Sequence, residues 1–186
     1  QQKRKKFARM PKISIVVPLY RTPEEYLREM LDSVRRQSYQ NWELCLSDGS
    51  GEDSPITEIL KEYTKKDSRI QVKNNKKQLH ISDNTNVALD MATGDYIAFM
   101  DHDDLLTPDA LYECVAELNE YPDTELIYTD EDKITMDGEE YFFPHFKSDF
   151  NLDMLCTTNY FCHLVVVKKE LYQAAGKLNG EYDGAQ

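Results

Sequence analysis

The stretch Tyr96-Ile97-Ala98-Phe99-Met100-Asp101-His102-Asp103-Asp104 is an apolar run of strand length that ends in three carboxylates. Side chains alternate between the two faces of an extended chain, so Asp101 and Asp103 are expected to point to the same side. Two neighbouring carboxylates repel each other unless a cation lies between them, and their oxygens suit Mg²⁺ or Mn²⁺. The stretch indicates either a metal site for a substrate diphosphate or a solvated acidic turn that caps the next helix.

The segments on both sides of this stretch alternate between strand and helix. Strands are predicted at Ile13–Pro18, Trp42–Ser47, Ile70–Lys73, the acidic stretch itself and Glu125–Thr129. Helices are predicted at Pro23–Gln37, Pro55–Lys66, Ser82–Ala92 and Thr107–Asn119. Thr22 and Thr107 are the expected N-caps, each before a proline, and Gly94 is the expected terminator of the third helix. The alternation predicts an α/β fold with a mixed, mostly parallel sheet flanked by helices.

Polar residues follow three of the predicted strands. The strand ends and polar loops concerned are Pro18-Leu19-Tyr20, Ser47-Asp48-Gly49 and Asp101-His102-Asp103. Ligands of such sheets bind outside the carboxyl ends of the strands. Because three polar loops are expected at one edge, the metal-site interpretation is favoured, and Asp104 is assigned to the turn before Thr107.

The composition restricts the function classes. The chain of 186 residues has a net charge of −12, which argues against a nucleic-acid partner and leaves a metal to attract any anionic substrate. It contains no signal peptide and no apolar run of membrane-spanning length. Its four cysteines lack CxxC spacing, and three lie in apolar contexts that predict buried free thiols. These features predict a cytoplasmic, reducing location.

The two ends differ from the central part. Residues 1–11 are predicted as a basic arm and residues 12–186 as one domain. The arm is either a peripheral contact to anionic lipid, at the inner face of the membrane, or a solvated terminus or linker, which is favoured. The end at Gly184-Ala185-Gln186 suggests a piece of a longer protein. Homo-oligomerisation is left open.

Three stretches resemble the signatures of family 2 glycosyltransferases, which have the Rossmann-like GT-A fold: Ile13–Tyr20, Leu46–Ser50 and Ala92–Asp104. Leu126–Lys133 and Asn159–Leu164 are similar to a bacterial subgroup that assembles surface polysaccharides or protein-linked glycans, including rhamnosyltransferase-like members. The resemblance covers nearly everything after residue 12. It implies an inverting enzyme that uses Mn²⁺ or Mg²⁺ to move a sugar from a UDP- or dTDP-sugar donor to a hydroxyl of a glycan, lipid-linked or protein-linked acceptor. A non-catalytic nucleotide-sugar-binding or assembly module of a larger glycosyltransferase is the alternative.

On the donor side, the resemblance implies that Pro18 and Tyr20 line the nucleobase pocket. Asp48 would accept a hydrogen bond from the base imide. Ser47 replaces one of the two acidic residues that the family usually carries there, which affects the expected nucleotide preference.

On the metal side, the resemblance implies that Asp101 contacts the ribose or the metal and that Asp103 ligates the metal. His102 stands where the family often has a small residue, and either contacts the donor or is structural. The general base would be the residue after Gln186, so this chain is expected to bind donor and metal without normal turnover.

The remaining polar candidates lie later in the chain. Asp130, Glu131 and Asp132 either reach the sugar or acceptor, or form a charged turn into a 133–143 hairpin. His163, in a predicted strand at Tyr160–Val167, is either structural or a metal or phosphate contact. His80 and His145 carry no motif and are expected to be structural or solvated.

Four aromatic residues follow the predicted hairpin turn: Tyr141, Phe142, Phe143 and Phe146. Packing in the core or its rim is favoured for them over stacking on a sugar ring. Two other enzyme classes fit less well. A haloacid-dehalogenase-type phosphatase needs a threonine shortly after its second aspartate, and a nucleotidyltransferase needs a Gly-rich basic loop after the first strand.

Overall fold

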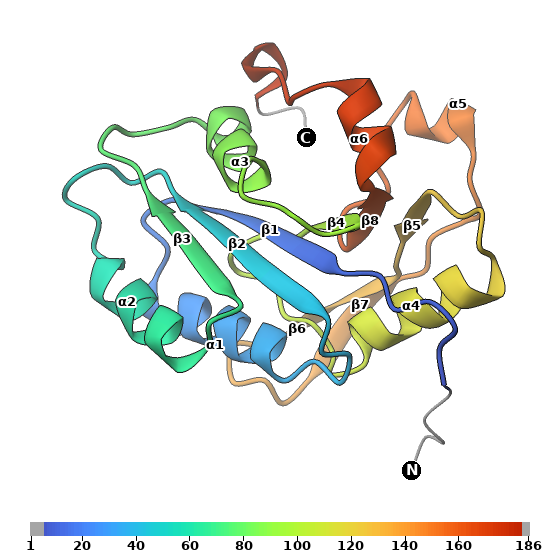
Figure 1. Cartoon of the computed structure of the whole chain (residues 1–186), viewed down its shortest axis with the longest axis horizontal. Helices are drawn as coiled ribbons and strands as arrows, with labels where there is room; N and C mark the ends of the chain where they lie inside the picture. Colours follow the sequence, from blue (N-terminus) through green and yellow to red (C-terminus); the bar gives the residue numbers. More distant parts are fainter. Residues whose placement is uncertain (1–5, 184–186) are drawn as a thin grey trace.

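The computed structural model describes residues 6–183 and contains one main sheet and one hairpin (Figure 1). The main sheet has the strand order β3-β2-β1-β4-β8-β5. Its strands are β1 (Ile13–Leu19), β2 (Trp42–Asp48), β3 (Ile70–Asn74), β4 (Tyr96–Phe99), β5 (Leu126–Tyr128) and β8 (Val165–Lys168). The first four are parallel, whereas β8 is antiparallel to both β4 and β5. The predicted mixed, mostly parallel sheet is therefore confirmed.

Helices cover both faces of this sheet (Figure 1). One face carries α1 (Glu24–Arg35), α2 (Thr57–Lys66) and α4 (Ala110–Glu120). The other carries α3 (Ile81–Leu89) and α6 (Lys169–Ala175). The short helix α5 (Leu152–Leu155) precedes β8, and a 3₁₀ turn, η1 (Gly180–Tyr182), follows α6. Within residues 6–183, no helix combines the length and the apolar character needed to span a bilayer.

The central strands are apolar on both sides because each face of the sheet is covered. In β1, Ile15 and Val17 join the larger core cluster, which also contains side chains of α1, α2 and α4. Val16 points the other way and packs in the cluster that contains Ala88 of α3. Strands buried on both faces read as continuous Val/Ile runs, as β1 does. This packing fixes the strand ends from which the site is built.

The predicted helix starts are wrong at both threonines. Helix α1 begins at Glu24 with Pro23 at the cap position, and the Thr22 hydroxyl is buried without a hydrogen-bond partner among the described residues. Pro23 has ψ 139°, an extended value, so it precedes the helix instead of opening it. Helix α4 likewise begins at Ala110, after Asp109, with no side-chain cap.

Gly94 does not terminate a helix, because α3 already ends at Leu89. It lies against the start of β1, where an added Cβ would stand 2.6 Å from the Lys12 carbonyl oxygen and 2.7 Å from Ser14 Oγ. The glycine is needed for this close approach of two chain segments.

The first described residues pack on the domain, contrary to the favoured picture of a solvated arm. The Phe7 ring lies 4.9 Å from that of Tyr112, and Arg9 N donates to Asn119 Oδ1 at 2.9 Å. The basic residues Lys3, Arg4 and Lys5, like Gly184–Gln186 at the other end, lie outside the described residues.

The four cysteines are free thiols, as predicted, but only two are buried. Cys45 and Cys114 are in the core, where burial is the main cause that raises the pKa of each thiol to about 12. Cys162 is half-buried and Cys156 is exposed, so the expectation of three buried thiols is wrong.

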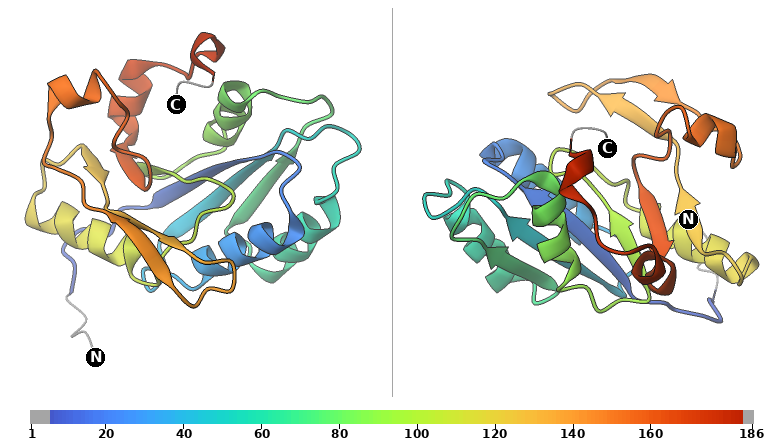
Figure 2. Two further views of the ribbon diagram at one scale, coloured as in Figure 1. Left: turned by 180° about the vertical axis from the view of Figure 1, so that it is seen from behind. Right: turned by 90° about the horizontal axis from the view of Figure 1, so that it is seen from above.

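The predicted hairpin is present as β6 (Glu131–Ile134) and β7 (Tyr141–His145), paired antiparallel. Its turn contains Gly138, whose φ of 73° favours glycine. The pair forms a separate ribbon that projects from the main sheet (Figure 2, right, light orange). Its aromatic side chains are exposed, so the prediction that they pack in the core or rim is wrong.

Candidate donor and metal site

Three strand ends meet at one edge of the main sheet, as the sequence predicts. In the parallel register Leu19 of β1 pairs with Asp48 of β2, and Val16 pairs with Phe99 of β4. The loops that follow these strands therefore leave the sheet at the same edge. Ser50 Oγ accepts a hydrogen bond from Arg21 N at 2.8 Å, which ties the first two loops together.

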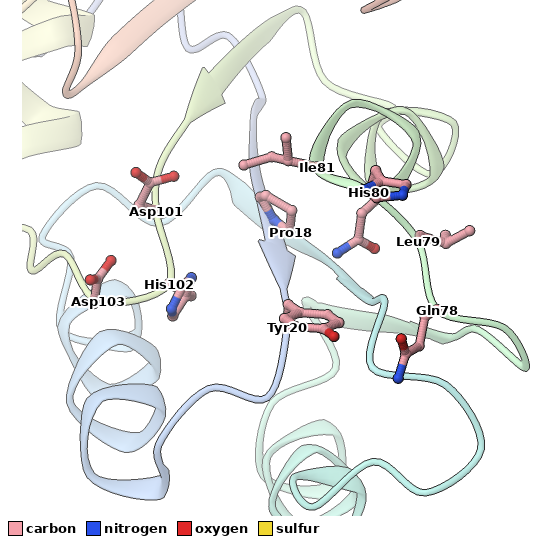
Figure 3. Close-up of a pocket in the computed structure, with 10 residues that line it drawn as sticks. Pro18, Tyr20, Gln78, Leu79, His80, Ile81, Asp101, His102 and Asp103 are labelled. Atoms are coloured by element: carbon pink, nitrogen blue, oxygen red, sulfur yellow. The ribbon is translucent and has the colours of Figure 1, made fainter. Parts of the chain in front are cut away.

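A cleft of about 580 Å³ opens at this edge (Figure 3). It is lined on one side by Pro18 and Tyr20, and on another by Asp101, His102 and Asp103. The segment before α3 and its first turn close the remaining side, with the following residues: Gln78, Leu79, His80, Ile81 and Asn84. The Tyr20 side chain is 47% exposed, so its ring is available to a planar ligand.

Asp48 is buried beside the cleft and already has two partners. Its Oδ1 accepts from Ser50 N at 2.9 Å, and its Oδ2 accepts from the Ser54 hydroxyl. The carboxylate therefore orders the loop after β2, and its predicted contact with a base imide stays a prediction. Ser47 donates to Asn84 Oδ1 at 2.7 Å, while Asn84 Nδ2 donates to the Leu19 carbonyl at 2.9 Å.

The acidic loop after β4 meets the loop before β8. His163 Nδ1 lies 3.7 Å from Asp101 Oδ2 and 3.5 Å from Asp104 Oδ2. One ligand atom from each of these three residues lies within 4.8 Å of the others. Two carboxylate oxygens and an imidazole nitrogen are a donor set that fits a divalent ion such as Mn²⁺.

A turn explains why Asp104, and not Asp103, joins this cluster. The strand ends at Phe99, so alternation along an extended chain does not apply to the aspartates. Asp104 N instead approaches the Asp101 carbonyl at 3.5 Å, as in a turn that brings residues i and i+3 together. Asp103 is exposed and lines the cleft on the same loop, and its role as a metal ligand stays a prediction.

The charges of the cluster are coupled. Burial disfavours the charged imidazolium, but the contact with Cys162 and the carboxylates of Asp101 and Asp104 outweigh it, and the pKa of His163 is raised to about 9. Burial also raises the pKa of Asp104, an effect that His163 opposes and the neighbouring carboxylates reinforce. The proton on His163 thus balances the negative charge of the two carboxylates. A metal ion held by all three residues would replace this proton and supply the positive charge instead.

Two residues after β5 hold the His163 loop in place. Glu131 Oε2 accepts from His163 N at 2.7 Å. The Lys147 side chain is 1% exposed, and its Nζ donates to the carbonyls of residues 161, 162 and 163 at 3.0 to 3.3 Å. Because the backbone here is bound by Lys147, β8 begins only at Val165. The predicted start of this strand at Tyr160 is therefore wrong, whereas the strand itself is confirmed from Val165 to Val167.

The three acidic residues after β5 have different positions. Asp130 accepts from Lys147 N at 2.8 Å, Glu131 supports the His163 loop, and Asp132 is exposed on β6. Their predicted contacts with sugar or acceptor stay predictions. Sequence reasoning missed His80 as a lining residue of the cleft, because no motif marks it and only the packing of α3 beside β1 places it there.

Solved structures share this fold. TarS of S. aureus (residues 1–349) in complex with UDP has a TM-score of 0.73 at 21% identity, over 94% of this chain and 52% of that one. With UDP-GlcNAc, the same protein gives a TM-score of 0.57 at 26% identity, over 63% and 33%. The mannosyltransferase PcManGT from Pyrobaculum calidifontis, in complex with GDP-Man and Mn²⁺, has a TM-score of 0.66 at 16% identity, over 95% and 51%. The α/β fold is therefore that of a GT-A domain.

Comparison with related sequences leads to the same family of proteins as the fold. The chain is 44% identical over 95% of its length to the uncharacterized protein y4gI of Sinorhizobium fredii, and 34% identical over 97% to the O-antigen biosynthesis protein RfbC of Myxococcus xanthus. It spans 19% and 14% of the lengths of these two proteins. The family model described as "Glycosyl transferase family 2" matches residues 14–172 of this chain. The chain belongs to glycosyl transferase family 2.

Proposed function

We propose that this domain binds a nucleoside-diphosphate sugar together with a divalent metal and transfers the sugar, with inversion, to a hydroxyl of a glycan acceptor. The observation that carries the proposal is the cluster of Asp101, Asp104 and His163 beside a cleft walled by Tyr20. A diphosphate needs a source of positive charge, which a protein with a net charge of −12 supplies poorly from its own side chains.

The position of each residue in or beside the cleft indicates which part of the donor–metal complex it would contact. Pro18 and Tyr20 would hold the nucleobase, with the Tyr20 ring stacked on it. Asp101, Asp104 and His163 would hold the metal, with Asp103 next to the diphosphate or as a further ligand. When bound, a divalent ion neutralises the charge that develops on the leaving diphosphate. No catalytic base is assigned among the described residues.

The comparisons support donor and metal binding in this fold. TarS binds UDP-GlcNAc and PcManGT binds GDP-Man with Mn²⁺. RfbC is named for O-antigen biosynthesis, so we propose a polysaccharide or related glycan, lipid-linked or protein-linked, as acceptor. UDP or dTDP is the proposed nucleotide.

Calorimetric titration tests the proposal. UDP, dTDP and GDP are titrated into the protein with Mn²⁺, with Mg²⁺ and with a chelator. We expect binding of UDP or dTDP that needs the metal, and loss of that binding in Asp103→Ala without loss of fold. Nucleotide binding that is equally strong with and without metal would refute the metal role. Nucleotide release on addition of acceptor is measured with the full-length protein, because this chain is expected to lack normal turnover. Binding by the full-length protein without nucleotide release would favour the non-catalytic module.

A further inference from the structure

The hairpin and the loop after it expose an unusual number of aromatic rings. The exposed fractions of these side chains range from 40% to 78%, and the residues are Tyr141, Phe142, Phe143, Phe146 and Phe150. We call these five residues the aromatic platform. Among the described residues, none of the five belongs to either core cluster. Rings that are this exposed contribute little buried apolar area to the stability of the fold, so their presence on the surface needs another explanation.

The backbone is strained to present two of these rings together. In the hairpin register Glu131 pairs with His145, and Lys133 pairs with Phe142. From one pair to the next, β6 covers two residues and β7 covers three, so β7 contains a bulge. Within it Phe143 has a φ of 49°, a left-handed conformation that is rare for a bulky side chain. Consecutive strand residues normally point to opposite faces, yet the Phe142 and Phe143 rings lie 5.6 Å apart. The strain thus places two exposed rings side by side.

The edges of the hairpin are poorly suited to pairing with another protein strand. Pro144 in β7 has no N–H to donate, and the bulge interrupts the ladder at the same place. On β6, Asp132 and Lys133 place charges along the strand. A ligand at this surface would therefore be bound by the faces of the aromatic rings and not by strand pairing.

The hairpin that carries the platform begins beside the candidate site. Glu131, the first residue of β6, binds His163 N, and His145 at the end of β7 lies 3.0 Å from Glu131 Oε1. At a rise of about 3.4 Å per residue, Phe142 lies roughly 10 Å along the strand from His145. A ligand on these rings would extend away from the metal cluster over a length of a few sugar units.

We propose that the aromatic platform binds the acceptor glycan, and that this glycan is neutral. The inference rests on the proposed function, which makes a glycan the acceptor. The electron-rich faces of the rings suit the C–H faces of pyranose sugars. Residues 131–150 contain six carboxylates and two lysines, so an acidic polymer would be repelled. Exposed carboxylates such as Glu139 and Glu140 can accept hydrogen bonds from sugar hydroxyls.

The test uses a printed array of bacterial surface oligosaccharides, both neutral and acidic. The wild-type chain is expected to bind neutral oligosaccharides, and the double variant Phe142→Ala/Phe143→Ala to bind them roughly tenfold more weakly. Tyr121→Ala is the matched control, because Tyr121 is an exposed aromatic residue at the end of α4, outside the platform. Equal binding by the double variant, or no neutral oligosaccharide bound by the wild type, overturns the proposal.

A single substitution separates binding from stability. Phe143→Gly removes a ring and relieves the left-handed strain, so we expect an unchanged or higher Tm together with weaker glycan binding. A Tm lowered by several degrees would show that the ring serves the fold and would overturn the proposal. So would wild-type dimers in sedimentation that dissociate in the double variant, because the platform would then bind a second copy.

The same samples are titrated with UDP and Mn²⁺. Normal UDP binding without glycan binding would refute glycan binding by the aromatic platform and leave the proposed function standing. Glycan binding without binding of any nucleotide supports the platform and refutes the proposed function.

Discussion

The Asp104 carboxylate lies 3.5 Å from Nδ1 of His163, and this pair joins the loop after β4 to the loop before β8. The contact brings an imidazole to the acidic end of β4. A run of aspartates is by itself equally compatible with a solvated turn, but with the imidazole it forms a compact set of oxygen and nitrogen atoms whose spacing fits a metal ion.

His163→Ala and Asp104→Asn are each expected to weaken Mn²⁺-dependent UDP binding by at least roughly tenfold, because each removes a proposed metal ligand. The measurement is calorimetry at fixed Mn²⁺, with circular dichroism as a check of the fold. Asp132→Asn serves as the control, since Asp132 is an exposed carboxylate on β6. Unchanged affinity in both variants would remove His163 and Asp104 from the metal site.

Tyr20→Ala is expected to weaken nucleotide binding by about 1–3 kcal/mol, the range for stacking of a base on an aromatic ring. Tyr20→Phe keeps the ring and should retain most of the affinity. Both are measured by titration with UDP in Mn²⁺. If Tyr20→Phe loses as much as Tyr20→Ala, the hydroxyl and not the ring contacts the nucleotide.

Lys147→Met should destabilise the fold by about 3 kcal/mol, because it leaves three carbonyls and Glu131 without their buried donor. The free energy of unfolding is measured in urea. Lys133→Met, at an exposed lysine of β6, should change it by less than about 0.5 kcal/mol. Equal effects of the two substitutions would show that the buried contacts of Lys147 are not needed.

Glu43 should make stability depend on pH in the acid range. Burial alone would raise the pKa of this carboxyl, but hydrogen bonds from Lys12, Ser14 and Thr93 lower it to about 2. An unfolded glutamate titrates near 4.5, so the ionised form stabilises the fold above that pH, and the contribution is lost as the pH falls from 4.5 towards 2. The difference corresponds to about 3 kcal/mol.

The measurement compares urea unfolding of wild type and Glu43→Gln at pH 7, 4.5 and 3. The variant lacks the titrating group, so the gap between the two proteins should shrink as the pH falls. A gap that stays constant over this range would show that the carboxyl of Glu43 does not titrate between the two states as proposed.

Sequence patterns predicted the fold better than they predicted contacts within the site. The Val/Ile run of β1 and the amphipathic stretch of α1, with Leu27, Met30, Leu31 and Val34 buried, are local signals that tertiary packing leaves unchanged. The predicted N-cap of α1 was wrong because its position depends on the ψ of one residue, Pro23, which the sequence does not reveal.

By itself, the sequence determined the alternation of strands and helices, the covered sheet, and the edge at which Pro18, Asp48 and Asp101 lie. Local periodicity and burial on both faces of a strand suffice for this. Only the tertiary structure decided that Asp104 and not Asp103 meets His163, and that the hairpin aromatics face solvent. These outcomes depend on a turn after Phe99, on the contacts of the buried Lys147 with residues 161–163 and on a bulge in β7. The periodicity of apolar residues along the sequence specifies none of the three.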